Sequence, residues 1–440
     1  MQTRKTHLIA QNNDAQFRNT MLSEVTSAKK NRALGTNTES CSNVDFKGFK
    51  KPSDLNKRQS YRSFTVALKE RAGEILYDPK KPINKQNRVC ACGKVRRHKN
   101  ESVSVEINQS TGDAKFGNLV HCGSVWLCPD CSYKISQERK KELAEAMKGC
   151  REKGLHVAML TLTVPHYLGD DLKILLKKMS KAKHSLWTNR NSREYLSDQF
   201  PMLGHITATE VKYSDNNGFH PHFHILCFLD KQYSSEDLQI IESELYEFWA
   251  EKCVKSGLGK PNLRNGIDLR MGSNNEDMLA DYISKWGMAD EMTQSHLKIG
   301  KKNLSSLTMW EVLELSKMEA STKDKYSYIF KTYATAFKGR RQLFWSKGLK
   351  ELLKVEIKED EEIANQEEEN VEPIIAMYLD IQDWWSICYH KSRAKFLDLI
   401  ELDYQRDGAD SDFKTANDFL RCLKNPKDFS GVKGMESHCS

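Results

Sequence analysis

The 440-residue sequence contains no hydrophobic run that approaches the length needed to cross a bilayer, about 18–20 apolar residues. This absence excludes a membrane-spanning protein. The first ten residues also lack the apolar stretch of a secretory signal, so we expect the chain to stay in the reducing cytoplasm. The twelve cysteines are then expected to be thiols or metal ligands rather than disulfides. No internal repeat is visible, and the length predicts about two to four structural units.

The net charge of +8 conceals an uneven distribution along the chain. Nine acidic residues and one lysine lie between Glu356 and Glu372, so this segment carries −8 and the other 423 residues carry +16. A basic body with a separate acidic segment suits a protein that binds a polyanion. Charge alone is equally consistent with a solvated surface and one acidic linker.

Residue types divide the chain into five segments. Residues 1–60 are rich in Asn, Ser, Thr, Lys and Gln and are expected to form a polar, disordered tail. Residues 61–135 are predicted to hold a helix followed by a cysteine module, and residues 136–350 alternate strand and helix patterns. An acidic linker at 351–373 then leads to a C-terminal region, 374–440, which is predicted to be helical.

The segment 136–350 predicts an α+β fold. Its strands are expected near residues 156–164, 204–211 and 220–229. The turn sequence from Asp215 to Gly218 favours a hairpin between the last two. One helix is expected to start after Ser234 and end at Gly257, and another to start at Ser273.

Three histidines alternate along one of these strands. His220, His222 and His224 share a face because side chains in a strand repeat with a period of two, while the apolar residues between them face the other way. A lone histidine is more often a core or surface residue. Three imidazoles on one face instead predict a metal site.

The hairpin brings a carboxylate to the same place. If the turn centres near Asn216 and Asn217, the numbers of opposed residues sum to about 433. Glu210 then lies beside His222 or His224. Two imidazoles and one carboxylate leave positions open on a divalent ion for water and phosphate oxygens. The alternative for Glu210 is a glutamate on the solvent face of its strand.

Tyr282 and Lys285 are three residues apart on the helix predicted after Ser273, so their side chains emerge on one side. A tyrosine is a poor nucleophile unless a cation stabilises its phenolate, and a metal or a lysine can do so. By itself the pair is weak evidence, because a tyrosine in an apolar helix stripe more often serves packing.

The cysteines predict a second metal site. Cys128 and Cys131 form a knuckle with two intervening residues, and Cys122 with Cys92 can complete a tetrahedral zinc site. Cys92 is favoured because Gly93 follows it, with Cys90, His98 and His121 as alternatives. A two-cysteine redox motif is the main competing interpretation.

The order of these motifs resembles the plasmid rolling-circle replication initiators (Rep proteins) of the HUH endonuclease superfamily. The resemblance covers roughly residues 90–350. It rests on an ordered set of motifs: Cys-Gly-Ser-Val-Trp-Leu-Cys-Pro-Asp-Cys131, the strand Leu160-Thr-Leu-Thr163, His-Pro-His-Phe-His224, Tyr-Ile-Ser-Lys285 and Arg-Gln-Leu-Phe-Trp-Ser-Lys-Gly-Leu-Lys350.

The resemblance implies a central antiparallel sheet flanked by helices and a metal-dependent, site-specific DNA nickase. His222 and His224 match the paired histidines of the superfamily, and Glu210 is placed like its third ligand for Mg²⁺ or Mn²⁺. Tyr282 matches the tyrosine that forms a 5′-phosphotyrosine and frees a 3′-hydroxyl, with Lys285 near the phosphate. The cysteine module would hold Zn²⁺.

The same resemblance implies partners and a location. Origin DNA, double-stranded and single-stranded, is the expected partner, together with a host helicase or polymerase, in the cytoplasm of a plasmid-bearing bacterium. Four residues are expected to contact DNA. They are His220, which fits the histidine motif but lies off the metal, and three residues of a basic-aromatic segment, Lys338, Arg340 and Arg341.

Two alternatives share part of the pattern. A single-strand DNA transposase of the HUH type uses two tyrosines on the nucleophile helix in the relatives most similar in layout, and no second tyrosine lies within two turns of Tyr282. A zinc-stabilised DNA-binding regulator would use the histidines only for a structural metal. Some relatives carry a glutamate at the position of Tyr282 and the tyrosine four residues later, where this chain has Trp286.

Overall fold

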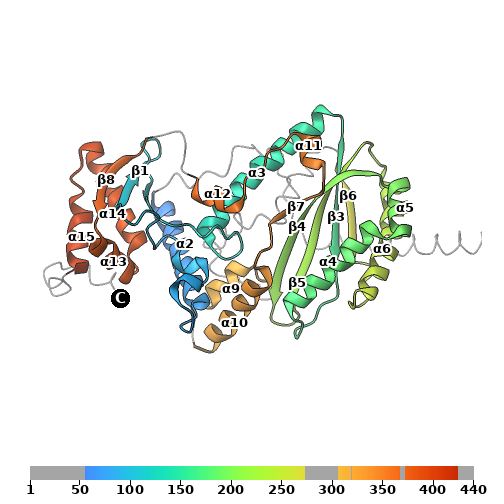
Figure 1. The fold of residues 1–440 in the computed structure, drawn as a ribbon, viewed down its shortest axis with the longest axis horizontal. Helices are drawn as coiled ribbons and strands as arrows, with labels where there is room; N and C mark the ends of the chain where they lie inside the picture. The colour runs from blue at the N-terminus through green and yellow to red at the C-terminus, as the bar shows by residue number, and fades with distance from the viewer. Residues whose placement is uncertain (1–54, 273–305, 319, 367–371, 425–440) are drawn as a thin grey trace, which may run out of the picture.

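A computed structural model describes residues 55–272, 306–318, 320–366 and 372–424 of the chain. Most of the predicted tail and the helix predicted after Ser273 lie outside these residues. Among the described helices, none has the length and apolar character needed to cross a bilayer. The described part of the chain is α+β, with two antiparallel sheets joined by a helical layer (Figure 1).

The larger sheet has five strands in the order β6-β3-β5-β4-β7, and every neighbouring pair is antiparallel. This sheet confirms the α+β class predicted from the alternating pattern. Its strands are β3 (His156–Thr163), β4 (Met202–Ser214), β5 (Gly218–Leu229), β6 (Ile267–Met271) and β7 (Leu343–Trp345).

Helices cover both faces of this sheet. Three of them pack on one face against the odd-numbered residues of β5. They are α4 (Leu172–Thr188), α5 (Arg190–Gln199) and α6 (Ser235–Lys255). The C-terminal half of α3 (Pro129–Glu152) and the short α11 (Leu349–Leu353) cover the opposite face (Figure 1).

Local sequence signals fix the ends of the central elements. Gly218 has a φ of +75° at the β4–β5 turn, and a Cβ there would lie 2.9 Å from the Leu168 Cα, so this turn requires glycine. Helix α6 begins with a capping box in which Ser234 and Asp237 each accept from the other's backbone N–H. Both the hairpin turn and this cap were predicted from sequence.

A smaller sheet joins two segments that are distant in sequence. It has the order β2-β1-β8, with β1 (Val103–Ile107), β2 (Ala114–Phe116) and β8 (Ile374–Leu379). Its core is closed by Trp384, Phe396 and Ile400. Trp384 lies on α13 (Ile381–Tyr389), and Phe396 and Ile400 lie on α14 (Arg393–Asp407). The 3₁₀ helix η4 (Gly408–Asp410) and α15 (Lys414–Lys424) follow.

This pairing differs from the all-helical region expected from residue 374. The segment begins with a strand, because Ile374–Leu379 is an apolar run short enough to be a strand and β1 offers it an edge. The core of the C-terminal region is consequently shared with Val103, Val105 and Ile107 rather than built alone.

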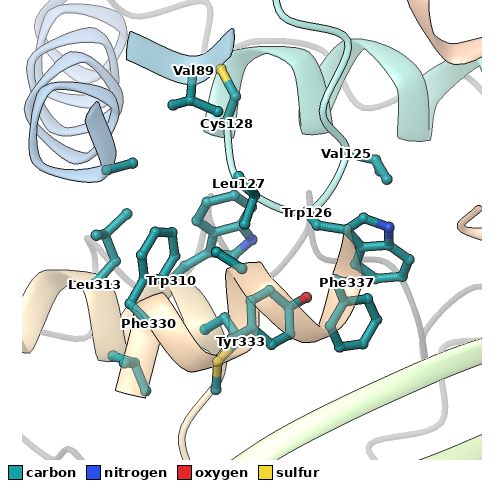
Figure 2. Packing of buried hydrophobic residues seen from close by; sticks show 14 of the residues in the cluster. Val89, Val125, Trp126, Leu127, Cys128, Trp310, Leu313, Phe330, Tyr333 and Phe337 are labelled. Atoms are coloured by element: carbon teal, nitrogen blue, oxygen red, sulfur yellow. The ribbon is translucent and has the colours of Figure 1, made fainter. Parts of the chain in front are cut away.

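A helical layer connects the two sheets. It contains α2 (Leu55–Leu76), the short 3₁₀ helices η2 (Ile83–Lys85) and η3 (Arg88–Ala91), α9 (Met309–Leu315) and α10 (Ala320–Phe337). Figure 2 shows Trp310, Phe330 and Tyr333 packing below the loop that ends at Cys128. The Trp126 ring lies against Phe337, and its Nε1 donates to the Arg340 carbonyl at 2.7 Å. The cysteine loop is therefore anchored on α10.

The acidic segment expected to be a linker is partly folded. It contains α11 and α12 (Asp360–Asn365), and α12 packs against α3 with Ile363 and Ala364 buried. Arg139, which is also buried, pairs with Asp360. The difference arises because two apolar residues among the acids give α12 a face to bury.

Candidate metal centres

The β4–β5 hairpin brings Glu210 and two histidines together. Glu210 lies directly opposite His222 in the register, so the opposed numbers sum to 432, close to the predicted 433. His224 lies two residues further along β5 on the same face, opposite Ala208, and its Nε2 is 2.8 Å from the Glu210 Oε2. One donor atom from each of Glu210, His222 and His224 falls within 4.8 Å of the others. We call these three residues the histidine cluster.

Neighbouring strands orient this cluster. The Thr161 Oγ1 on β3 lies 3.2 Å from the His224 Nδ1, which leaves Nε2 directed at Glu210. Lys212 extends from β4 with its Nζ 3.1 Å from the Glu210 Oε1. Thr161 was not singled out from the sequence as a site residue, although it belongs to the strand motif Leu160-Thr-Leu-Thr163 and its register partner is His224.

The electrostatics put the cluster in the protonation states that metal ligands need. Burial raises the pKa of Glu210, but the hydrogen bond with His224 and the charge of Lys212 outweigh it and bring the pKa to about 2. Burial, with His220 as neighbour, lowers the pKa of His222 to about 3. At neutral pH the carboxylate is therefore ionised and the His222 imidazole is neutral, with a lone pair free to coordinate.

His220 sits beside the cluster without joining it. Its ring stacks on His166 with centroids 4.1 Å apart and lies tilted against His222 with centroids 4.0 Å apart, and it pairs with Lys212 in the register. Burial and the nearby His166 lower its pKa to about 4. His166, in the loop after β3, was not predicted as part of this row.

The donor set fits a hard or borderline divalent cation. Two imidazole nitrogens and one carboxylate oxygen are a mixed set, and three protein donors leave coordination positions for water or phosphate oxygen. Only His224 of the three is fully buried, so the cluster is reached from one side. The opposite face of β5 is apolar, with Phe223, Ile225 and Cys227 in the core, as predicted.

Four cysteines converge at the N-terminal end of α3. We call Cys92, Cys122, Cys128 and Cys131 the cysteine cluster; all four are buried and their sulfurs lie within 4.8 Å of one another. The Sγ of Cys92 is 3.6 Å from that of Cys128 and 3.8 Å from that of Cys131. The Sγ atoms of Cys122 and Cys131 are 3.6 Å apart.

These spacings fit a tetrahedral zinc site. A Zn–S bond of about 2.3 Å places tetrahedral sulfurs about 3.8 Å apart, whereas a disulfide needs about 2.05 Å. All four cysteines are free thiols. Gly93, with a φ of +62°, turns the chain directly after Cys92, and Cys128 caps α3 so that Cys131 faces the cluster from its first turn.

The alternatives weighed for the fourth position lie outside this cluster. The Cys90 Sγ approaches the Gly73 carbonyl at 3.4 Å instead. His121 lies next to the cluster, and hydrogen bonding with the Cys131 and Cys92 sulfurs raises its pKa to about 9. His98 is exposed and does not belong to the group.

An ion pair between a buried lysine and a partly exposed aspartate flanks the cysteine cluster. Lys69 of α2 pairs with Asp130, between the two knuckle cysteines. Burial disfavours the charged lysine, but Asp130 outweighs this and the pKa of Lys69 is raised. A fixed cation therefore lies beside sulfurs that carry negative charge when they bind zinc.

The other predicted site residues differ in exposure, and two of them lie outside the part of the chain that the structure describes. Tyr282 and Lys285 lie outside the described residues. Lys338 and Arg341 are exposed, and Arg341 NH2 lies 3.3 Å from the Glu359 Oε1. Arg340 is half-buried, and its Nε donates to the Ala336 carbonyl. Of the aromatic pair that follows on β7, Phe344 is exposed and Trp345 packs on the sheet core.

Residues 116–259 match a family model described as a replication protein. A protein named Protein rep from Streptomyces lividans is 22% identical over 303 residues, which cover 56% of this chain and 66% of the relative. The resemblance to rolling-circle replication initiators is confirmed. Protein rep of Lentilactobacillus hilgardii is 26% identical over 170 residues, 38% of this chain and 49% of that protein. Protein rep of a Bacillus species is 29% identical over 160 residues, 35% and 48% of the two chains.

The segment that matches the replication-protein family contains most residues of both clusters. Residues 116–259 run from the end of β2 to just beyond α6, and they include the whole histidine cluster and three of the four cysteines. The chain spans about half to two thirds of the length of these curated Rep relatives. No solved structure is significantly similar to it.

Proposed function

We propose that this chain initiates rolling-circle plasmid replication as an HUH-type nickase that cuts origin DNA at the histidine cluster. The observation that carries the proposal is the convergence of Glu210, His222 and His224 on one hairpin, with the carboxylate ionised and an approach from solvent. The match of this same segment to replication proteins supports it.

Glu210, His222 and His224 would hold a divalent cation, Mg²⁺ or Mn²⁺, and the bound ion would polarise the scissile phosphate and neutralise charge on its non-bridging oxygen. The chain supplies the arrangement around it. Glu210 and His222 are fixed opposite each other by strand pairing, and Thr161 holds the His224 ring in one orientation. Lys212, beside Glu210, adds a positive charge on the side from which a phosphate approaches.

Tyr282 is the proposed nucleophile. Its oxygen forms a bond to phosphorus, the bond from phosphorus to the 3′ oxygen breaks, and that oxygen takes a proton to become a 3′-hydroxyl. One phosphate ester replaces another, so the bond energy is kept in a 5′-phosphotyrosine until the strand is transferred. Lys285, one helical turn away in the sequence pattern, favours the phenolate. The free 3′-hydroxyl then serves a host polymerase, working with a host helicase.

The cysteine cluster has a structural role in this proposal. Its four buried sulfurs leave no open position on a zinc ion, which is typical of structural rather than catalytic zinc. Zinc there would tie Cys92, which follows η3, and the loop at Cys122 to the start of α3, and so would fix the helix that covers one face of the nuclease sheet.

The test is covalent trapping. The full chain is incubated with Mn²⁺ or Mg²⁺ and a labelled single-stranded hairpin oligonucleotide from the replication origin, and a protein–DNA adduct is sought on a denaturing gel. We expect an adduct with wild type and none with Tyr282→Phe or after chelation by EDTA. Wild type that binds the oligonucleotide without forming an adduct contradicts the nickase assignment, and an adduct with Tyr282→Phe contradicts the choice of nucleophile.

A further inference from the structure

A basic cleft of about 450 Å³ lies where α2 meets the end of α9, the start of α10 and the start of α14. One face of α2 forms a wall of the cleft, with residues at helical spacing from Ser63 to Glu74. Small side chains, Ser63, Ala67 and Ala394, leave the space open. Three segments that are distant in sequence therefore build one concavity.

The charge of the lining is strongly one-sided. Five basic side chains and two acidic ones line the cleft, which gives a net charge of +3. The basic residues are Arg71, Lys317, Lys323, Lys391 and Lys395. Both acids are already committed, because Glu70 pairs with Arg393 and Lys94, and Glu74 pairs with Arg71 and Lys391.

Three lysines remain at the rim. Lys317, Lys323 and Lys395 are exposed, and within the described ranges no carboxylate forms an ion pair with any of them. Arg71 keeps the cleft in shape, since its Nε and NH2 donate to the Ser316 and Ser327 hydroxyls at 3.1 and 2.7 Å. Fixed walls with unpaired ammonium groups are the features of a site for phosphate.

Side-chain contacts connect the cleft to the hairpin that carries the histidine cluster. Two residues after Lys323, the Lys325 Nζ lies 2.8 Å from Asp215 at the β4–β5 turn. The next residue, Tyr326, donates its hydroxyl to the other Asp215 oxygen at 3.0 Å. Helix α10 therefore connects the rim of the cleft to the hairpin that carries Glu210, His222 and His224.

We propose that this cleft binds the phosphate backbone of duplex DNA flanking the nick site, through Lys317, Lys323 and Lys395. The inference rests on the proposed nickase function and adds a second DNA contact to it. The recognition is electrostatic and independent of base sequence, and it anchors the duplex while a single strand reaches the histidine cluster.

The test compares a triple variant, Lys317→Ala/Lys323→Ala/Lys395→Ala, with a matched control, Lys153→Ala/Lys231→Ala/Lys414→Ala, which removes three exposed lysines from other surfaces. Duplex affinity is measured by fluorescence anisotropy from 50 to 300 mM salt. The cleft variant is expected to bind at least about tenfold more weakly at 100 mM salt, with a salt slope shallower by about 2. Both variants should keep the wild-type melting temperature within a few degrees.

Two further arms separate the possible sources of phosphate and the two proposals. Adduct formation on a short single-stranded hairpin, which needs the histidine cluster and Tyr282 but not the flanking duplex, should be unchanged in the cleft variant. Wild-type duplex affinity and salt slope in that variant overturn the cleft assignment even if nicking is normal. Loss of binding to ATP or GTP with unchanged duplex affinity also overturns it, because the cleft would then take a free nucleotide. Absence of adduct in wild type refutes the nickase but leaves the duplex measurement intact.

Discussion

The cysteine cluster and the histidine cluster both bring together side chains from separate segments, but they differ in the number of donor atoms, in the chemistry of those atoms and in their exposure to solvent. The cysteine cluster has four thiols, all buried, drawn from a turn, a loop and the start of a helix. The histidine cluster has three donors on two paired strands, and two of them are partly exposed. A saturated, buried set holds a fold together, whereas an unsaturated set at a surface leaves room for a substrate.

The supports around the clusters differ as well. The histidine cluster is positioned by backbone pairing across β3, β5 and β4, so its geometry depends on strand register. The cysteine cluster draws on the end of η3, a loop and the first turn of α3, and a bound metal would join these three segments. We therefore expect metal loss to unfold one region and only to inactivate the other.

The largest effect is expected at the cysteine cluster. Cys92→Ser or removal of zinc should lower the free energy of unfolding by several kcal/mol, which is less than the full zinc-binding free energy of zinc-finger peptides, about 10–16 kcal/mol. Thermal unfolding and zinc content measure this. Cys90→Ser, two residues away, is the matched control and should cost less than about 1 kcal/mol, because its sulfur only approaches the Gly73 carbonyl. Equal losses of stability in Cys92→Ser and Cys90→Ser would contradict the choice of Cys92 as the zinc ligand.

The histidine cluster should show the opposite pattern. His222→Ala, His224→Ala and Glu210→Gln are each expected to slow adduct formation by at least about 1,000-fold, ~4 kcal/mol of transition-state stabilisation, with little change in melting temperature. His184→Ala, on the exposed side of α4, is the control and should nick normally. Retained cleavage in His222→Ala/His224→Ala would refute the metal assignment.

His205 tests how far burial alone sets the protonation of a histidine in this sheet. Burial and the neighbouring Lys183 lower its pKa to about 4, so the unfolded chain binds more protons between about pH 6.5 and 4. The stability that this site contributes is lost as pH falls through that window, by at most about 3 kcal/mol. Urea unfolding of His205→Gln should show a flatter pH dependence than wild type, and Lys183→Met a smaller change in the same direction. An unchanged profile in His205→Gln would contradict the buried neutral state.

Thr161 should separate positioning from ligation. Thr161→Val removes the hydroxyl next to the His224 Nδ1 but no ligand, so we expect Mn²⁺ affinity to fall by about 10–100-fold with the maximal rate at saturating Mn²⁺ largely retained. Thr161→Ser keeps the hydroxyl and should restore affinity. A Thr161→Ser variant as weak as Thr161→Val would point to packing rather than to the hydrogen bond.

The smallest effect is expected where α12 meets the basic surface. Glu359 and Glu361 pair with Arg341 and Arg88, and all four side chains are exposed. Glu359→Gln/Glu361→Gln should therefore change stability by less than about 1 kcal/mol. If the acids compete with DNA for these arginines, duplex affinity should rise a few-fold and the salt slope should steepen; an unchanged slope would assign α12 to packing alone. Deleting the segment is a poorer test because Ile363 and Ala364 are buried.

The histidine hairpin was predictable because its information is local. A turn with glycine at a position of positive φ fixes the centre, and the period of two then places Glu210 opposite His222. The spacing of the cysteines also carried enough information to select Cys128, Cys131 and Cys122 for one group, and the glycine after Cys92 favoured it over Cys90.

The rest of the fold depends on contacts that no local pattern records. The pairing of β1 with β8 joins Val103 to Leu379, and short apolar runs such as these can be strand or helix until a partner is known. The same holds for Thr161 and His166, whose relation to the histidines appears only when β3 and the following loop lie next to β5. Ile363 likewise gave no sign among its acidic neighbours that it would be buried.

The pairing of β1 with β8 also has a consequence for biosynthesis. More than two hundred residues separate the paired strands, so β1 leaves the ribosome long before its partner exists. The edge of β1 that pairs with β8 stays unpaired until residues 374–424 have been translated. The apolar side chains of Val103, Val105 and Ile107 stay exposed to solvent for the same time. A chain cut short by premature termination or proteolysis before β8 retains the hairpin but loses this module, and we expect it to become a substrate for chaperones and proteases.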